Sequence, residues 1–207
     1  MRKIESVISD LKRYNNNYIK SDILKKTNEK IWEYPEFSQW PGSIGNHHRY
    51  NGGLVVHTEE VWRYALNTAS LFDADLDVLF TAILWHDLGK IWDYKKETVK
   101  DSSVPFVVYN SKEVDVINVP YPAKLDWVKT DYHALIHHIT GSVSEFTRHA
   151  LNFDLDRVTL EKVQHCIAGH HGFPEWRSPV TPKSLEAKIL HHSDMLSAFH
   201  GGTKDEL

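Results

Sequence analysis

One stretch of this sequence places an ionisable pair directly after an apolar helix. Apolar side chains recur through residues 76–84 at the spacing of a buried helix. His86 and Asp87 follow at once, and Gly89 and Lys90 complete the motif. Buried charges are costly unless they are paired or bind a metal ion, and imidazole and carboxylate groups both ligate first-row metals. A lone His-Asp pair is more often a surface pair, so the prediction of a metal site here depends on the rest of the chain.

Further histidines and aspartates recur along the chain in positions that face inward. The sequence has 14 histidines, which include doublets at 47–48, 137–138, 170–171 and 191–192. His57 lies on the inward stripe of one expected helix, and Asp194 lies in the last one. Each of these residues could have an ordinary role instead of binding metal. The histidine could be a hydrogen-bonded core residue, and the aspartate could pair with a lysine. Repetition over four helices favours one shared cluster. We expect His138 rather than His137 to take part, because only His138 approaches the apolar stripe of its helix.

The hydrophobic periodicity predicts an all-α domain with one insertion. Residues of about 93–130 differ, because β-branched runs at 105–109 and 114–119 flank a polar turn and predict a β-hairpin that leans on the helical body. We divide the chain into an N-terminal helical lead, 1–46, packed on the core, and a main domain, 47–207. Helices are expected over about 2–13, 21–32, 54–72, 76–84, 130–146 (with Leu135 and Ile136 on its apolar stripe), 158–168 and 182–199.

Composition narrows the class of protein. The chain has 207 residues and a net charge of −4, so no global basic field indicates strong binding to duplex nucleic acid. Cys166 is the only cysteine, which fits a reducing compartment. The sequence shows neither a signal peptide nor an apolar run that could span a membrane. The terminal Lys-Asp-Glu-Leu is therefore interpreted as a coincidence, and we expect a cytoplasmic protein of bacterial or bacteriophage type.

The order of these motifs resembles the HD superfamily of metal-dependent phosphohydrolases, and most closely the HD domain of bacterial 3′→5′ exoribonucleases. The resemblance covers about residues 40–198, apart from the insertion, and implies an HD-domain helical bundle with a small β-hairpin insertion. The first 40 residues do not match the nucleic-acid-binding module of that family, and the insertion is longer than expected. The matching stretches are 47–54 with His57, 84–90, 138–139, 170–179, and 186–191 ahead of Asp194.

The resemblance also implies ligands for one or two divalent ions, with Asp87 as the bridge between them. Mn, Fe, Co, Ni or Zn would suit imidazole and carboxylate ligands, and Mg less well. The ligands implied for the first ion are His57, His86, Asp87 and Asp194. The ligands implied for the second ion are Asp87, His138 and His170, with His171 as a further candidate.

The implied reaction is attack on phosphorus by a water whose pKa the ions lower. Asp87 and Lys90 are the expected catalytic residues, because Lys90 would neutralise charge on the phosphate oxygens. His47, His48 and Arg49, together with Lys90, are the expected substrate-binding residues.

Several functions remain open at this point. The leading hypothesis is an enzyme, a phosphohydrolase or phosphodiesterase that acts on a nucleotide or a short single-stranded oligonucleotide. The alternatives are a di-iron HD-type oxygenase, a nucleic-acid-processing or nucleic-acid-binding module, and a non-catalytic module that keeps its metal. Lys90 favours phosphate chemistry over dioxygen chemistry. Aromatic residues near the insertion, such as Tyr94 and Trp127, either stack on bases or attach the hairpin to the helices. The sequence leaves the oligomeric state open.

Overall fold

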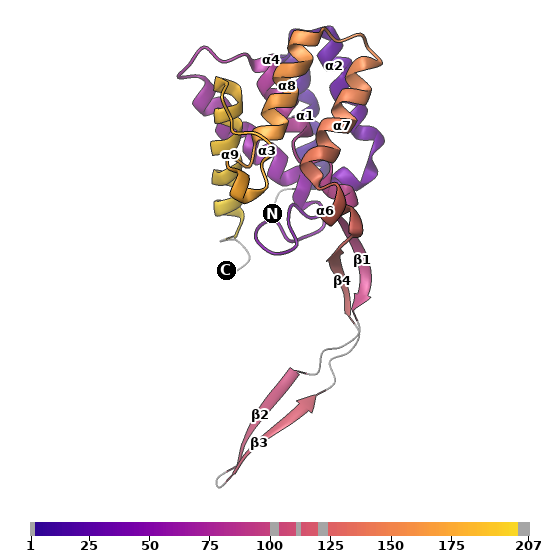
Figure 1. Cartoon of the computed structure of the whole chain (residues 1–207), viewed down its shortest axis with the longest axis vertical. Helices are drawn as coiled ribbons and strands as arrows, with labels where there is room; N and C mark the ends of the chain where they lie inside the picture. The colour runs from indigo at the N-terminus through magenta and orange to yellow at the C-terminus, as the bar shows by residue number, and fades with distance from the viewer. Residues whose placement is uncertain (1–2, 100–103, 111–112, 120–123, 203–207) are drawn as a thin grey trace.

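A computed structural model of the chain describes residues 3–99, 104–110, 113–119 and 124–202. It is a bundle of helices from which strands project at one end (Figure 1), and it confirms the expected helical fold with a small β insertion. Within those ranges, no helix is both long and apolar enough to cross a membrane. The elements are α1 (Ile4–Tyr18), α2 (Asp22–Glu29), η1 (Lys30–Glu33), η2 (Pro35–Ser38), α3 (Gly53–Ala69), α4 (Leu76–Trp85), α5 (Lys90–Asp93), β1 (Tyr94–Val99), β2 (Val104–Asn110), β3 (Glu113–Val119), β4 (Lys124–Lys129), α6 (Asp131–Leu135), α7 (His138–Leu151), α8 (Arg157–Gly169), η3 (Pro174–Trp176) and α9 (Leu185–Gly202).

Helix α4 is the buried centre of the bundle. Every residue from Val78 to Trp85 is buried, and α2, α3, α7, α8 and α9 all pack against this helix. A helix that is apolar on all sides must be covered on all sides, so its own sequence requires these neighbours. Asp75 caps its start by accepting a hydrogen bond from the backbone N–H of Val78 (3.3 Å). Because α4 is held from every direction, the His-Asp pair at its C-terminal end is held as well.

A buried polar network joins the N-terminal helices to α4. The side-chain amide of Asn28 donates to Asn15 Oδ1 (3.0 Å) and to Thr81 Oγ1 (3.1 Å), and Asn28 Oδ1 accepts from Trp85 Nε1 (3.1 Å). Partners on two other helices, α1 and α4, satisfy an amide that would be costly to bury alone. These contacts fix α1 and α2 on the bundle, while the domain boundary at residue 46 stays a prediction.

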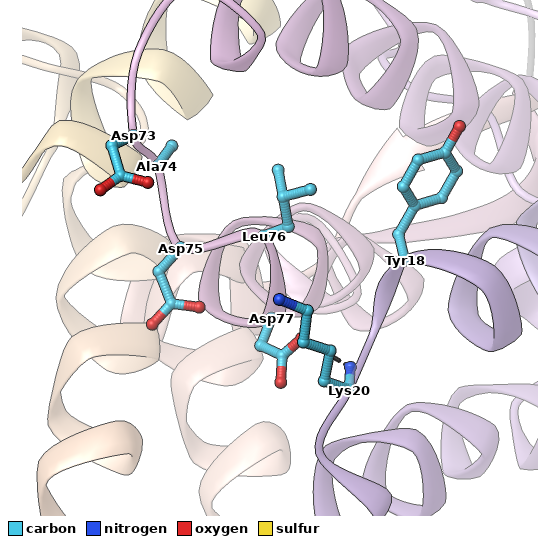
Figure 2. A pocket seen from close by; sticks show the side chains of 7 residues that line it. All are labelled: Tyr18, Lys20, Asp73, Ala74, Asp75, Leu76 and Asp77. Atoms are coloured by element: carbon cyan, nitrogen blue, oxygen red, sulfur yellow. Dashed lines mark hydrogen bonds between the residues drawn. The ribbon is translucent and has the colours of Figure 1, made fainter.

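The first turn of α4 is tied to the link between α1 and α2. The Asp77 carboxylate accepts hydrogen bonds from the backbone N–H groups of Lys20 (2.7 Å) and Ser21 (2.8 Å), and Figure 2 shows Asp77 beside Lys20. A surface cavity of about 550 Å³ lies here, lined by Tyr18, Lys20 and residues 73–77. Ten helical residues separate this end of α4 from the His-Asp pair, a length of about 15 Å. The cavity is therefore remote from the histidines discussed below.

The predicted hairpin is present as the antiparallel pair β2–β3. Val104 lies opposite Val119, and Asn110 lies opposite Glu113. Figure 1 shows this pair beyond β1 and β4 and away from the helices, so the expectation that it leans on the helical body is wrong.

A second ladder, β1–β4, forms the base of the insertion and was not predicted. It pairs Tyr94 with Lys129 at one end and Val99 with Lys124 at the other. The exposed charged residues 95–97 show no apolar alternation, so the usual sequence signal for a strand is missing there. Trp40 attaches this ladder to the bundle: its ring packs edge-on against Trp127 at 4.9 Å, and its Nε1 donates to the Tyr94 carbonyl (3.1 Å).

The helix expected from about residue 130 to 146 is broken in two. α6 ends at Leu135, His137 has a positive φ of 68°, and α7 begins at His138. Leu135 and Ile136, expected on the apolar stripe, are instead exposed by 80% and 44%. The break makes His138 the first residue of α7 and turns it inward, where it is buried.

Candidate metal centre

Five helices bring the predicted ligands to one place inside the bundle. His57 lies in α3, the His86–Asp87 pair ends α4, and His138 begins α7. His170 directly follows α8, and Asp194 lies in α9. His57, His86, His170, Asp87, His138 and Asp194 are all buried.

The Asp87 carboxylate divides these residues into two groups, because each of its oxygens faces different histidines. Oδ2 lies 3.4 Å from His57 Nε2 and 3.3 Å from His86 Nε2. Oδ1 lies 3.5 Å from His138 Nε2 and 3.6 Å from His170 Nε2. A carboxylate whose two oxygens face separate pairs of histidine nitrogens has the geometry needed to bridge two neighbouring metal sites.

Each group gains further donors. On the Oδ2 side, Asp194 Oδ1 lies 3.0 Å from His57 Nε2, and the ligand atoms of His57, His86 and Asp194 lie within 4.8 Å of one another. On the Oδ1 side, the ligand atoms of His138, His170 and His171 meet the same limit. The residues expected from the sequence therefore assemble as two adjoining sets.

Two histidines are aimed at Asp87 by the same local device. His86 and His170 each follow the last residue of a helix, and each Nδ1 lies 2.7 Å from the carbonyl three residues earlier, that of Ile83 and Ile167 respectively. Carbonyls in the last turn of a helix keep accepting capacity for such a bond, and the Ile167 carbonyl accepts it beside a long bond from the backbone N–H of His170 (3.5 Å). A carbonyl can only accept, which places the proton on Nδ1 and leaves a lone pair on Nε2.

The other two histidines obtain the same orientation from side chains. His138 Nδ1 donates to Asp93 Oδ2 (3.1 Å), and His57 Nδ1 lies 3.0 Å from Ser197 Oγ. Hydrogen-bonded partners of this kind fix the ring orientation and the tautomer of metal-ligating histidines. Neither Asp93 nor Ser197 was predicted. Asp93 could have been noticed in the sequence, because it is a second aspartate just after the His-Asp motif. Ser197 lies one helical turn after Asp194, and no sequence pattern distinguishes it.

Unsatisfied buried atoms gather at this cluster. In the part of the chain that the structure describes, the buried side-chain atoms without a hydrogen bond are Trp62 Nε1 and five cluster atoms: Asp87 Oδ1, Asp87 Oδ2, Asp93 Oδ1, His138 Nε2 and His170 Nε2. Of these, Asp87 Oδ2 forms an ion pair with Lys90. Buried polar groups are almost always satisfied, so such a set requires an explanation. Burial opposes ionisation of Asp87, but Lys90 and the neighbouring histidines outweigh it and lower its pKa. Nitrogen lone pairs and ionised carboxylates that converge in this way fit a divalent transition metal ion.

Gly89 allows α7 to reach the cluster. A Cβ at this position would lie 2.1 Å from the His138 carbonyl oxygen, which no side chain permits. The Gly89 backbone N–H also donates to Ser142 Oγ (2.8 Å). The close approach of these backbones brings His138 beside Asp87.

Lys90 is buried at the edge of the cluster. Its Nζ lies 2.5 Å from Asp87 Oδ2 and donates to the Gly42 carbonyl (2.7 Å). Burial alone would lower the pKa of Lys90, but the Asp87 carboxylate outweighs burial and raises it. The ammonium group is therefore charged.

The three remaining substrate-binding candidates divide between the site and the surface. His47 lines a cavity of about 300 Å³ with Lys90, and burial lowers its pKa to about 2. His48 turns away from that cavity, because its Nε2 lies 3.0 Å from Glu60 Oε2. Arg49 is exposed on the same loop, and no contact found among the described residues brings it to the cluster.

The rings of His171 and His137 both lie beside the ring of His138. The ring centroid of His171 is 5.1 Å from that of His138, and its Nδ1 donates to the Trp176 carbonyl (2.7 Å). His137 is grouped with Asp93 and His138 rather than with Asp87. Its predicted absence from the ligands remains a prediction.

Comparison with known proteins places this arrangement in a family. The chain is similar in sequence to curated 3′-5′ exoribonucleases called YhaM. Its identity is 29% to the protein from Bacillus licheniformis, 30% to that from Bacillus pumilus and 29% to that from Bacillus subtilis, each over 199 residues and 96% of this chain. The chain spans about half the length of these relatives, 53% in each case. No solved structure gives a significant match. The family described as HD domain matches residues 54–198, which hold the two ligand sets, and the chain therefore belongs to this family.

Proposed function

We propose that this chain is a phosphodiesterase that removes nucleotides from the 3′ end of short single-stranded RNA at a centre for two metal ions. The observation that carries the proposal is the division of Asp87, with Oδ2 toward His57 and His86 and Oδ1 toward His138 and His170. The exoribonucleases of similar sequence support the choice of substrate.

The two ligand sets assign the donors for each ion. One ion would be held by His57, His86, Asp87 Oδ2 and Asp194, and the other by Asp87 Oδ1, His138, His170 and His171. These nitrogen and oxygen donors suit Mn, Fe, Co, Ni or Zn. When bound, such ions lower the pKa of water from about 15.7 toward 7 and offset the charge on a phosphate group.

Lys90 would stabilise charge on the reacting phosphate. An ammonium group has three N–H donors. The carbonyl of Gly42 and the carboxylate of Asp87 use two of them, and Lys90 lines the cavity beside Asp194. The third N–H can therefore donate to a non-bridging phosphate oxygen without rearrangement of the ammonium group. A fixed donor in a buried site is effective because it does not need to reorient during the reaction.

The residues of the 47–49 loop would contribute unequally. His47 lines the cavity and would contact the substrate directly. His48 would hold His47 in place, because its Nδ1 lies 3.0 Å from His47 Nδ1 while Glu60 binds its other nitrogen. Arg49 would contact the substrate backbone outside the cavity.

The position of Lys90 also favours phosphate chemistry over a di-iron oxygenase. A buried cation that points into the substrate cavity serves an anionic substrate, whereas activation of dioxygen has less need of it.

A substrate panel tests the proposal. Protein loaded with Mn²⁺ would be given short RNA, short DNA, a cyclic dinucleotide, a deoxynucleoside triphosphate and bis(p-nitrophenyl) phosphate. We expect mononucleotides to be released stepwise from the 3′ end of single-stranded RNA, and no release by Asp87→Ala protein prepared in parallel. Metal-replete protein that leaves every phosphodiester intact, or that consumes dioxygen in an Fe-loaded form, would overturn the proposal.

A further inference from the structure

Trp176 forms an aromatic wall of the cavity at the metal centre. The cavity is lined by the polar residues His47, Lys90, His171 and Asp194, by the apolar residues Trp176, Met195 and Ala198, and by Asn46. Trp176 is 50% exposed and Met195 is 42% exposed. One cavity therefore combines an ammonium group suited to a phosphate, that of Lys90, with an accessible apolar surface.

Trp176 is held at a fixed distance from the proposed ligands. Its carbonyl accepts a hydrogen bond from His171 Nδ1 (2.7 Å), and its N–H donates to the Phe173 carbonyl (3.0 Å) within the short helix η3. The Phe173 ring packs perpendicular to the indole at 5.4 Å, and the His191 ring lies 6.3 Å away. The backbone of the next residue, Arg177, has a positive φ of 64°, a strained conformation that clusters at functional sites.

The size and chemistry of the cavity match one nucleotide. Its volume of about 300 Å³ is at the small end of ligand sites, which span roughly 300–1,000 Å³. Indole stacks well on the flat face of any nucleobase, and such stacking tolerates every base. A base inside a duplex has both faces covered by its neighbours, so this wall is open to a base at the end of a strand or in a single strand.

We infer that Trp176 is the stacking platform for the base of the nucleotide whose phosphate lies at the metal centre. This inference rests on the proposed function and names its specificity element: the site selects an unpaired terminal nucleotide by the presence of a base, without selecting which base. Lys90 and the metal ligands would bind the phosphate, and Trp176 would bind the base across the same cavity.

Two small ligands separate the base from the phosphate. Adenosine 5′-monophosphate and ribose 5-phosphate share the sugar and the phosphate, and only the first carries a base. Calorimetric titration of Mn-loaded protein would give the affinity of each. We expect native protein to prefer adenosine 5′-monophosphate about 5- to 150-fold, the factor that corresponds to roughly 1–3 kcal/mol per stacked base.

Variants assign this preference to Trp176. Trp176→Ala should bring the preference close to one while leaving the affinity for ribose 5-phosphate and the metal content unchanged, and Trp176→Phe should restore most of it. Phe72→Ala is the matched control. It also removes an exposed aromatic ring (56% exposed), but Phe72 lies between α3 and the start of α4 and does not line this cavity, so the variant should keep the full preference. Circular dichroism would verify that each variant is folded.

The outcomes separate this inference from the proposed function. A native protein that binds both ligands equally, that binds neither, or whose preference survives in Trp176→Ala would overturn the role of Trp176. If RNA is hydrolysed in that case, the proposed function stands alone. If the preference depends on Trp176 but no phosphodiester is cleaved, the stacking site stands and the proposed function fails.

Discussion

Replacement of Asp93 by asparagine should weaken the binding of one metal ion and leave the binding of the other unchanged. Asp93 is fully buried, and its Oδ2 accepts hydrogen bonds from His138 Nδ1 (3.1 Å) and His133 Nδ1 (2.8 Å). Burial opposes ionisation of this carboxyl group, but the bonds from His138 and His133 outweigh it and lower its pKa. Asp93 therefore keeps the proton of His138 on Nδ1, and the Nε2 lone pair faces Asp87. In Asp93→Asn, a neutral amide replaces the carboxylate and holds that tautomer less firmly.

The expected effect follows from which histidine Asp93 touches. Loss of such a hydrogen-bonded partner typically lowers metal affinity 10- to 100-fold, an effect of about 1.4–2.7 kcal/mol. This loss of affinity should be confined to the ion bound by His138. The first ion should keep its affinity, because His57 and His86 are oriented by Ser197 and by the Ile83 carbonyl instead.

The assay is competition for Mn²⁺ or Zn²⁺ against a chromophoric chelator, with elemental analysis of the dialysed protein. Asp77→Asn is the matched control, because the Asp77 carboxylate also accepts two hydrogen bonds but lies at the far end of α4. We expect two equivalents of metal in the control and one tight and one weakened equivalent in Asp93→Asn. Affinities that match native protein at both sites, or that fall equally at both, would refute the assigned role of Asp93.

Three further predictions follow from the structure. Lys90→Ala should keep its metal, measured by elemental analysis, but lose about 10²–10³ in kcat on short RNA; full turnover by the metal-replete variant would remove the role of Lys90 on phosphate. Replacement of residues 100–123 by Asn-Gly should close β1–β4 as a simple hairpin, since Val99 pairs with Lys124. Metal content should then persist while relative rates across the substrate panel change; loss of metal would show that the insertion is structural. Asn28→Ala should lower the free energy of unfolding by about 1–3 kcal/mol in urea titrations, because Trp85 Nε1 loses its buried acceptor. A change under 0.5 kcal/mol would contradict that.

Local patterns in the sequence determined the helical fold class and singled out the His86–Asp87 pair, and the resemblance to the HD superfamily implied the full set of candidate ligands. Helix α4 is apolar except for Asp77 and Thr81, so it requires burial on nearly every side, and that requirement favours a helical bundle. The β-branched runs at 105–109 and 114–119, with a polar turn between them, likewise encode the hairpin within a short window. His86 and Asp87 could be proposed from sequence because an ionisable pair directly after such a helix is unusual.

The tertiary structure decided how these residues are arranged. Asp93 reaches His138 across 45 residues, and Ser197 reaches His57 across 140, so neither contact leaves a local pattern. The β1–β4 ladder likewise depends on pairing between distant strands and on the Trp40 ring rather than on apolar alternation. Periodicity reports which face of an element is buried, but the partner that a buried polar atom finds depends on how whole helices pack. The division of Asp87 between two histidine pairs therefore became visible only in the assembled bundle.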